Sequence, residues 1–479
     1  MTREEILSFY EAGPDAVVTL VQSLITEFQA QVQALNERVR ELETRLAKDS
    51  HNSHKPPSSD EPTFRRRAPK SLRKPSGKKP GGQAGHTGCT RVQVDEPDDV
   101  HLHVPGSCAH CGDDLRGVDA RLAQRRQVVD IPPLALHVAE HQVHDKRCPG
   151  CGHTTRAVFP QGVNNPVQYG PRMQGLAVYL QVHQLLPYAR AAELIGDLFG
   201  ETISEGTLTR TLKRAYARLE PVEQQIHAAL RSSPSVHFDE TGLRIDSKRQ
   251  WVHSAGTPTL TLYRAHAKRG RKAIDAMGVL PGYEGVSIHD AYTSYLSYPG
   301  RHALCNVHLL RDLVAVEEET KAAWAPRTGE LLLEIKAAAT QARASGAAQL
   351  EPAQIQAYRA RYDALLCQGE AAHPPSPPTG RAGRRKQSSA YNLVRRLKKH
   401  ADLVLAFMYD IEIPFDNNLA ERDLRMLKTK QKISGGFRCQ DGADVFCRIR
   451  SYISTIRKQH LPLLEALRSV FSDAPMMPC

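Results

Sequence analysis

The chain has 479 residues, of which 41% are hydrophobic and 24% are charged, a balance typical of a globular protein with several domains. It has 64 basic and 52 acidic side chains, so its formal charge is +12 and nucleic acid is the favoured partner. No run of about 18 apolar residues is present to cross a membrane, and the acidic start is unlike a signal peptide. We therefore expect a cytoplasmic protein with no membrane partner.

Apolar residues recur at alternating steps of three and four between residues 17 and 47. A repeat of 3.5 residues keeps one apolar seam of a helix facing a partner helix. We expect residues 1–50 to form an N-terminal coiled coil that pairs subunits; a single amphipathic helix packed on its own domain is the alternative. The seam consists of Val18, Val21, Ile25, Phe28, Val32, Leu35, Val39, Leu42 and Leu46.

Proline, glycine and basic residues dominate the next segment, so residues 51–100 are predicted to form a disordered linker. Nine basic residues and no acid lie between Pro62 and Val94. We interpret this stretch as an arm that follows the DNA backbone without sequence specificity; a solubilising tether is the alternative. The candidate DNA contacts are Arg65, Arg66, Arg67, Lys70, Arg73, Lys74, Lys78 and Lys79.

Residues 101–160 contain two CxxC sequences, each followed by glycine. Each makes a tight knuckle that can direct two thiolates at one metal, and two knuckles complete a four-sulfur structural zinc site. Between the two knuckles, apolar and polar residues alternate at 127–131 and at 136–143, which favours a β-hairpin made of these two stretches. A redox dithiol is the poorer alternative, because no thioredoxin-like strand–helix–strand pattern surrounds the cysteines. The predicted zinc ligands are Cys108, Cys111, Cys148 and Cys151.

Residues 165–230 are predicted to be helical. Gly200 separates two amphipathic stretches, and Ser204 is suited to cap the second. A helix, a short glycine turn and a capped helix form the helix-turn-helix pattern. Arg210 and Lys213, on the polar side of the second helix, are then candidate DNA contacts. A purely structural helical hairpin is the alternative.

Three acids are the candidates for catalysis. Asp239 and Asp290 stand at the ends of predicted apolar strands, in a part of the chain that predicts a meander and one further buried strand. Glu421 falls in the second turn of a helix that either Asp416 or Asn417 caps. Carboxylates from two strands and a helix suit a pair of Mg²⁺ ions, which prefer oxygen ligands. For each acid alone, a capping or salt-bridged surface role is the alternative.

Several motifs, taken in chain order, carry a family resemblance. They are NSHKPPSSD, the two cysteine knuckles, HFDETGLRI, HDAYTSY, CNVHLLRDL and DNNLAERDLRMLKTKQKISGGFR. The ordered set resembles the insertion-sequence-66 family of bacterial transposases over nearly the whole chain. That resemblance implies an RNase H-like α/β core at 231–310 and 391–435. A helical insertion with a Pro/Arg-rich loop would occupy 311–390, and a helical tail 436–479.

The resemblance also implies a D-D-E catalytic triad, which falls on Asp239, Asp290 and Glu421. These side chains would hold two Mg²⁺ or Mn²⁺ ions while the enzyme cleaves transposon ends and transfers the 3′-OH to target DNA. Cys305 and His308 match a CxxH signature of related transposases. We interpret both as packing near the active site, and a second zinc site is the alternative.

The helix of Glu421 carries basic and amide residues that are candidates for holding the DNA strand near the cut; a solvated helix face is the alternative. These residues are Asn417, Asn418, Arg422, Arg425, Lys428 and Lys430. Glu240 and His289, beside the two aspartates, are expected to point away from them, because side chains alternate along a strand.

The partners implied are transposon ends and target DNA, a second copy of the chain, and accessory proteins of the element. Two other functions remain as alternatives. A zinc-dependent DNA-binding regulator would need the knuckles and the basic arm but not the carboxylates. An RNase H-like nuclease would cut DNA without joining it.

Overall fold

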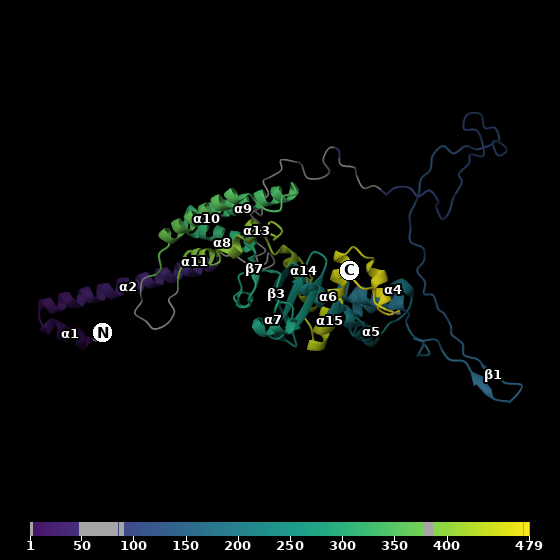
Figure 1. The fold of residues 1–479 in the computed structure, drawn as a ribbon, viewed down its shortest axis with the longest axis horizontal. Helices are drawn as coiled ribbons and strands as arrows, with labels where there is room; N and C mark the ends of the chain where they lie inside the picture. The colour runs from purple at the N-terminus through teal and green to yellow at the C-terminus, as the bar shows by residue number, and fades with distance from the viewer. Residues whose placement is uncertain (1–2, 47–84, 86–90, 377–386, 473, 479) are drawn as a thin grey trace. The chain divides into compact units, whose positions relative to one another are not determined.

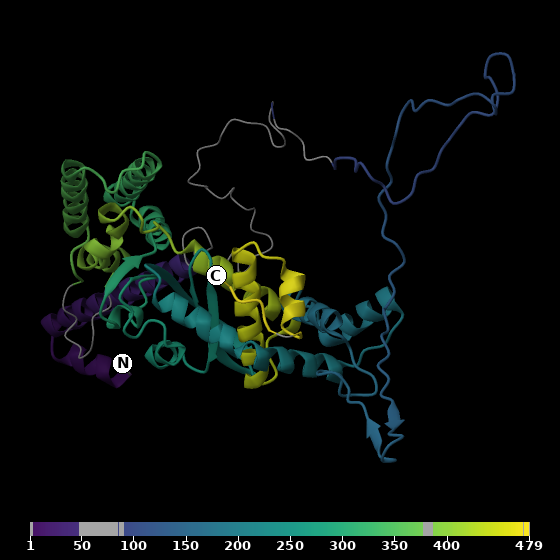
Figure 2. The same cartoon turned by 45° about the vertical axis from the view of Figure 1, so that its right-hand side comes forward.

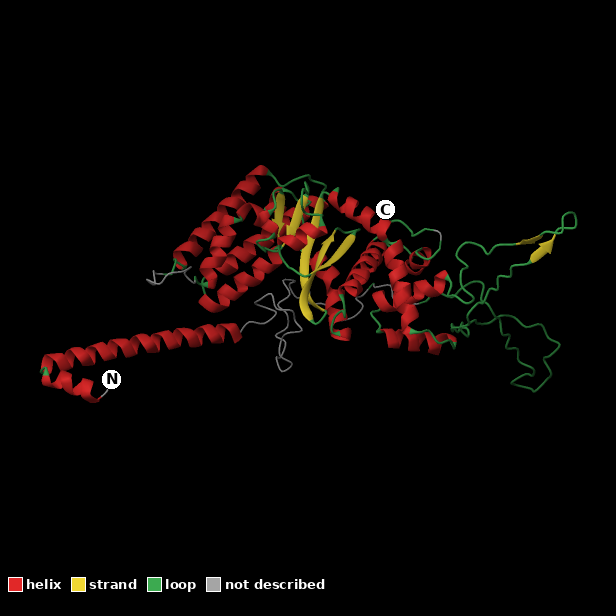
Figure 3. Cartoon of the chain, turned by 90° about the horizontal axis from the view of Figure 1, so that it is seen from below, coloured by secondary structure: helices red, strands yellow, loops and turns green. Residues whose placement is uncertain are grey.

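A computed structural model describes residues 3–46, 85, 91–376, 387–472 and 474–478. The described parts of the chain belong to two compact units. One comprises residues 1–65, 165–194 and 202–479, and the other comprises 66–164 and 195–201. The fold is mixed α/β, with one large sheet among many helices (Figure 3). No described helix is long and apolar enough to cross a membrane. The predicted DNA arm, residues 65–79, lies outside the described residues.

The N-terminal residues form two helices, α1 (Arg3–Glu11) and α2 (Pro14–Leu46) (Figure 1). Pro14 and Asp15 suit the first turn of α2, because proline lacks an N–H that would be unpaired there and an acid complements the helix dipole. α2 has 33 residues and is about 50 Å long at 1.5 Å per residue. Its predicted seam is exposed, Phe28 at 68% and Leu35 at 66%. The helix itself is therefore confirmed, whereas its pairing with a second copy stays a prediction.

The core sheet has five strands in the order β5-β4-β3-β6-β7. β4 runs antiparallel to both of its neighbours, whereas β6 runs parallel to β3 and to β7. The strands are β3 (Ser235–Ile245), β4 (Lys248–Gly256), β5 (Thr261–His266), β6 (Val286–His289) and β7 (Arg301–Leu304).

One prediction about this sheet is wrong. The strand that carries Asp239 does not end beside it, because β3 continues without a break for 11 residues. Gly242 lies within β3, opposite Trp251 of β4. A Cβ at this position would lie 3.3 Å from Nε of Arg249, so the glycine makes room for a side chain of the next strand. Asp239 thus lies in mid-strand, and Asp290 directly follows β6.

The helices that precede the sheet in the chain pack against the C-terminal helices, on the β5 side of the sheet. Figure 2 shows the yellow helix α15 beside the teal helices α5 and α6, and α16 packs on α3. Buried Ile449, Ile453 and Ile456 of α15 belong to the same hydrophobic core as β5. The helices are α3 (Pro171–Val178), the π-helix η2 (Tyr179–His183), α4 (Tyr188–Phe199), α5 (Glu205–Arg218), α6 (Glu220–Arg231), α7 (Arg271–Met277), α15 (Gln440–Lys458) and α16 (Leu463–Ser469).

A second hydrophobic core lies between β6, β7 and the helices that follow them. It joins Val286 and Ile288 of the sheet to residues of the helical segment that separates β7 from α14. The two ends of this segment meet, since the N–H of Asn306 donates to the carbonyl oxygen of Phe415 at 3.1 Å. Its helices are α8 (Asn306–Thr320), α9 (Trp324–Ala344), α10 (Pro352–Ala372), α11 (Ser389–Lys399), α12 (Ala401–Val404) and α13 (Ala406–Tyr409).

The unit that contains the cysteine knuckles has little regular structure. Its hairpin, β1 (Asp145–Arg147) and β2 (Thr154–Arg156), encloses the second knuckle. The hairpin predicted at 127–131 and 136–143 is wrong: those residues form no strand. Their alternation does not mark a half-buried face, because none of the described residues 91–164 is buried. The described residues 91–164 therefore form no hydrophobic core of their own.

Candidate functional site

β3 and β6 bring the two predicted catalytic aspartates to one place. Their parallel register pairs His237 with Ile288. Asp239 and Asp290 each follow two residues after this pair (237 to 239 and 288 to 290), so they occupy equivalent positions in the parallel register. The sheet thus presents both carboxyl groups at the point where β6 ends.

The third predicted acid, Glu421, lies on α14 (Asn418–Ser434), and the start of this helix is fixed to β3. The side chain of Asn417, 3% exposed, donates from Nδ2 to the carbonyl oxygen of Phe238 at 2.8 Å. Its Oδ1 lies 2.8 Å from Nδ1 of His237. The backbone N–H of Glu421 donates to the carbonyl oxygen of Asn417 at 3.3 Å, one helical turn later. Glu421 is therefore positioned through a buried amide that binds the residue preceding Asp239.

The prediction of DNA contact is wrong for Asn417, because its side chain is buried and engaged on both polar atoms. Nor does that side chain cap α14. Asp416 does so instead: its Oδ1 accepts a hydrogen bond from the N–H of Asn418 at 3.1 Å.

The far end of α14 is also fixed to β3. After the helix, the N–H of Phe437 donates to the carbonyl oxygen of Arg244 at 2.9 Å, and its carbonyl oxygen accepts from Asp246 at 3.0 Å. Gly436 has a φ of 145°, and a Cβ there would collide with the Arg244 carbonyl oxygen. The second glycine of the SGGFR motif is thus required for this close approach. Both ends of α14 are thus hydrogen-bonded to β3. These bonds fix the position of α14 along the strand, and with it the position of Glu421 relative to Asp239.

Replacing Asn417 with alanine is expected to lower the free energy of unfolding by about 2–4 kcal/mol, because two buried polar groups lose their partners. Asn418→Ala is the matched control; its side chain is partly exposed, so the loss should stay within about 0.5 kcal/mol. Urea unfolding followed by circular dichroism measures both. Equal losses in the two variants would contradict the role assigned to the buried amide.

The electrostatics around Asp239 are unfavourable for an isolated carboxylate. Burial raises its pKa well above the usual value, and the negative charges of Glu240, Asp290 and Glu421 raise it further. A divalent cation would relieve this repulsion, so the donor set fits a metal with a preference for oxygen. Among the described residues, the oxygens of the three predicted catalytic acids are not all within 4.8 Å of one another.

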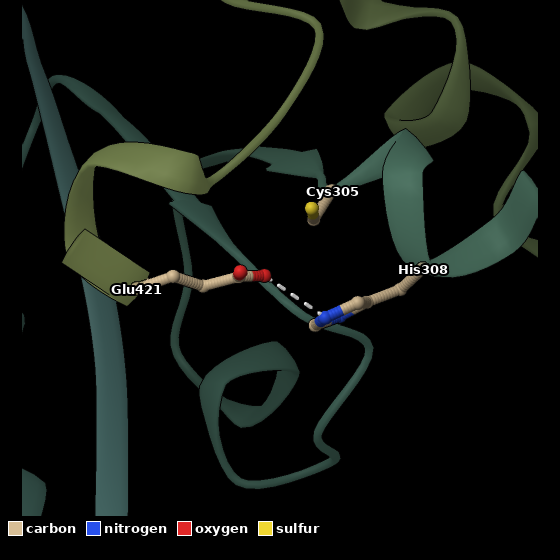
Figure 4. Close-up of side chains that lie close together, drawn as sticks. All are labelled: Cys305, His308 and Glu421. Atoms are coloured by element: carbon tan, nitrogen blue, oxygen red, sulfur yellow. Dashed lines mark ion pairs between the residues drawn. The ribbon is translucent and has the colours of Figure 1, made fainter. Parts of the chain in front are cut away.

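The side chain of Glu421 faces His308 and Cys305 (Figure 4). Its Oε1 lies 3.1 Å from Nε2 of His308, and this contact is the largest cause of the lowered pKa of Glu421. Cys305 Sγ is beside both, and accepts a hydrogen bond from the N–H of Asn417 at 3.2 Å. The two residues of the CxxH signature thus lie directly against the third predicted catalytic acid.

Glu240 and His289 form a buried network behind the aspartates. Oε1 of Glu240 accepts from Nε of Arg269 at 2.7 Å, and Oε2 accepts from the hydroxyl of Tyr295 at 2.5 Å. The ring of His289 stacks on Tyr295 at 4.9 Å, and burial lowers the pKa of His289 to about 4. His289 is therefore neutral at pH 7. The sequence contained no signal for Arg269 or Tyr295 as parts of this network.

Basic residues surround the carboxylates on the side of α14. Arg425, one turn after Glu421, is exposed, and its charge lowers the pKa of Glu421. Arg311 has the same effect and was missed at the sequence level, although it follows His308 by three residues on one helix face. Nζ of Lys428 lies 3.4 Å from the carbonyl oxygen of Gly242 on β3.

Four further predicted DNA contacts lie on α14 and α5. Arg422 is exposed on α14, whereas Nζ of Lys430 is 3.3 Å from the hydroxyl of Ser434, at the end of the helix. Arg210 and Lys213 are exposed on α5. The N-cap expected for this helix is present, since Oγ of Ser204 accepts the N–H of Thr207 at 3.1 Å.

The two cysteine knuckles have the same backbone design. The N–H of Gly112 donates to the carbonyl oxygen of Cys108, and that of Gly152 donates to the carbonyl oxygen of Cys148, each at 2.9 Å. The glycines adopt φ values of 82° and 73°, which favour glycine. Backbone N–H groups of each knuckle lower the pKa of Cys108 and of Cys148, which favours the metal-binding thiolate. No three of the four sulfurs, all in described residues, lie within 4.8 Å of one another.

Comparison with protein families gives three matches. The profile of the Transposase IS66 family matches residues 166–445, more than half of the chain. A zinc-finger binding domain of transposase IS66 matches residues 105–152, which include both knuckles. A family of unknown function matches residues 11–92. No curated protein matches the chain.

Proposed function

The chain belongs to the IS66 family of transposases, and on that premise we propose that it cleaves transposon ends and joins the freed 3′-OH to target DNA by D-D-E chemistry. Membership confirms the resemblance drawn from the motifs, and it implies a DNA-acting enzyme with a zinc-binding domain. The observation that carries the proposal is the convergence of Asp239, Asp290 and Glu421, whose charges interact although they come from three elements.

The sheet supports an RNase H-like core. Three strands form an antiparallel meander, and two further strands add in parallel beside the first of them. The candidate acids lie on the central strand, after its parallel neighbour, and on a helix that follows a long helical insertion. This is the arrangement that the D-D-E interpretation requires.

Asp239, Asp290 and Glu421 would hold the Mg²⁺ or Mn²⁺ ions. Bound ions of this kind stabilise negative charge on the attacking and leaving oxygens of a phosphoryl transfer. The chain's own cations would orient the DNA: Arg311 and Arg425 beside Glu421 are placed to bind phosphate oxygens of the strand to be cut. In the first step water displaces the 3′-oxygen at the transposon end, and in the second the released 3′-OH displaces a 3′-oxygen of the target.

Other parts of the chain would assemble the complex. The zinc-binding domain and the exposed side of α5 would recognise the transposon ends, and accessory proteins of the element would complete the assembly. The apolar seam of α2 would pair two copies as a coiled coil, so that two ends are held together. Exposure of the whole described seam supports this assignment.

The stabilisation by Mg²⁺ is expected to grow with pH. Without metal, the folded chain retains a proton on Asp239 that the unfolded chain releases near about pH 4. The protonated Asp239 therefore contributes stability below about pH 4. That contribution is lost as the pH rises through the raised pKa of Asp239 in the folded chain. Mg²⁺ binds the ionised form, so it should raise the melting temperature more at about pH 8 than at about pH 5. Asp239→Asn should remove this dependence; equal increments at both pH values in the wild type would contradict it.

A strand-transfer assay tests the function. Full-length protein is incubated with Mg²⁺, labelled DNA carrying the element's own ends, and a supercoiled target. Joined products that require the metal support the transposase. Binding without cleavage, also in Mn²⁺ and with the element's neighbouring proteins added, would favour a DNA-binding regulator. Cleavage without joining would favour a nuclease.

A further inference from the structure

A second cluster of metal-ligating side chains lies between α8 and α14, apart from the cysteine knuckles. Cys305, His308 and Glu421 each offer one ligand atom, and these atoms all lie within 4.8 Å of one another. Figure 4 shows the three side chains facing a common space. In a tetrahedral zinc site, nitrogen and oxygen ligands lie about 3.3 Å apart, and sulfur lies about 3.6 Å from either. The 3.1 Å between His308 and Glu421 is already close to that spacing.

The carboxylate of Glu421 supplies a second observation. Its Oε1 is buried from solvent and lies 3.1 Å from Nε2 of His308, so these two ligand atoms already face each other. A histidine nitrogen that binds a metal directs its lone pair at the ion, and does not direct an N–H at the neighbouring oxygen. An ion bound between these two atoms would therefore replace the proton that now lies between them.

The chemistry of the three ligands selects the metal. Mg²⁺ prefers oxygen, whereas a set of thiolate, imidazole and carboxylate suits Zn²⁺. Cys305 is the N-cap residue of α8, and the N–H of Asn417 donates to its sulfur. Burial raises the pKa of the thiol to about 12, so the thiolate would form only as the metal binds. Binding would release the thiol proton to solvent. Three protein ligands leave the fourth position to water.

We propose that Cys305, His308 and Glu421 bind a zinc ion, and that this ion withholds Glu421 from Asp239 and Asp290. Zinc bound here is then an inhibitor that competes with the Mg²⁺-dependent use of the same carboxylate. Zinc binding stands apart from the proposed function, whereas the inhibition rests on it.

The zinc content of the full-length chain tests the binding without use of DNA. After dialysis against a zinc buffer, Cys305→Ser and His308→Gln should each hold about one zinc ion fewer per chain than the wild type. Cys367→Ser, which removes an exposed thiol from α10, is the matched control and should hold as much as the wild type. Equal zinc content in the wild type, Cys305→Ser and His308→Gln would overturn the site.

Both ligand variants are chosen to keep the fold. Serine is of similar size to cysteine and is a favoured N-cap residue, and the His308 side chain is 23% exposed. Circular dichroism verifies that each is folded. Because the zinc count does not depend on DNA cleavage, it decides the site even if the chain proves not to be a transposase.

Inhibition is measured in the Mg²⁺-dependent cleavage assay. Added ZnCl₂ should lower the wild-type rate by about tenfold or more, within the usual range of coupling between two ligands. Cys305→Ser, compared with its own zinc-free rate, should lose less than about twofold. Equal inhibition of both proteins would overturn the competition for Glu421.

Discussion

Asparagine in place of Asp290 is expected to lower strand cleavage by roughly a thousandfold, because the site loses one metal ligand and its charge where the transition state develops charge. DNA affinity should stay within about twofold, since phosphate contacts elsewhere dominate binding. The local backbone should also hold: asparagine keeps an oxygen to accept the N–H of Tyr292, which now donates to Asp290 at 3.0 Å. Cleavage of labelled end DNA and a gel-shift titration measure the two quantities.

Asp246→Asn provides the matched control. This acid lies in the turn between β3 and β4, is 66% exposed, and is 3.5 Å from Lys248. Its φ of 52° is one that asparagine tolerates, so cleavage should be unchanged. Wild-type cleavage by Asp290→Asn would contradict the catalytic assignment, and a regulator would behave in this way. An equal loss in both variants would point to a general effect of lost charge.

Removal of zinc is expected to unfold residues 105–156 while the rest of the chain stays folded. The described part of this segment contains no buried residue, so little besides the metal can hold its two knuckles together. Cys148→Ala should therefore increase protease cleavage between residues 91 and 164 by about a hundredfold or more, because cleavage follows the population of the open form. Limited proteolysis with mass spectrometry locates the cuts.

Cys367→Ala is the control for this experiment, since Cys367 is an exposed thiol outside the knuckles. A chelator should reproduce the effect of Cys148→Ala in the wild type. Protection of residues 91–164 that persists in both Cys148→Ala and the chelated protein would contradict a structural zinc. Loss of end-DNA binding in parallel with the new cuts would link this unit to recognition of the ends.

The periodicity of the sequence predicted the helices well because apolar residues recur along one side of each of them. Ser204 capped its helix as expected, and the heptads of α2 lie in one helix. Glycine was harder to interpret. Gly200, with a φ of 71°, marks a turn, whereas Gly242 lies within a strand and makes room for Arg249. Local sequence does not distinguish these two uses, because the second depends on a neighbour in space.

The candidate site was predicted only in part, for a similar reason. Strand ends and helix caps pointed to the three acids, but the contact of His308 with Glu421 joins residues that are far apart in the chain. Asn417 was assigned to DNA because it was expected on the helix of Glu421, near the DNA strand to be cut. Its actual partners, His237 and Phe238, lie on a strand about 180 residues earlier. Such long-range contacts follow from tertiary packing and leave no local pattern.

The hydrogen bond between Asn306 and Phe415 brings the two ends of the helical insertion together at the core. The chain leaves the end of β7 and returns beside its point of departure, so changes in the length of the insertion need not move Glu421. Its helices still cover β6 and β7, so deleting it would expose the sheet. Adding to it is different: residues 345–349, between α9 and α10, are exposed. This turn is a natural point at which to fuse a programmable DNA-binding domain and direct insertion to a chosen sequence.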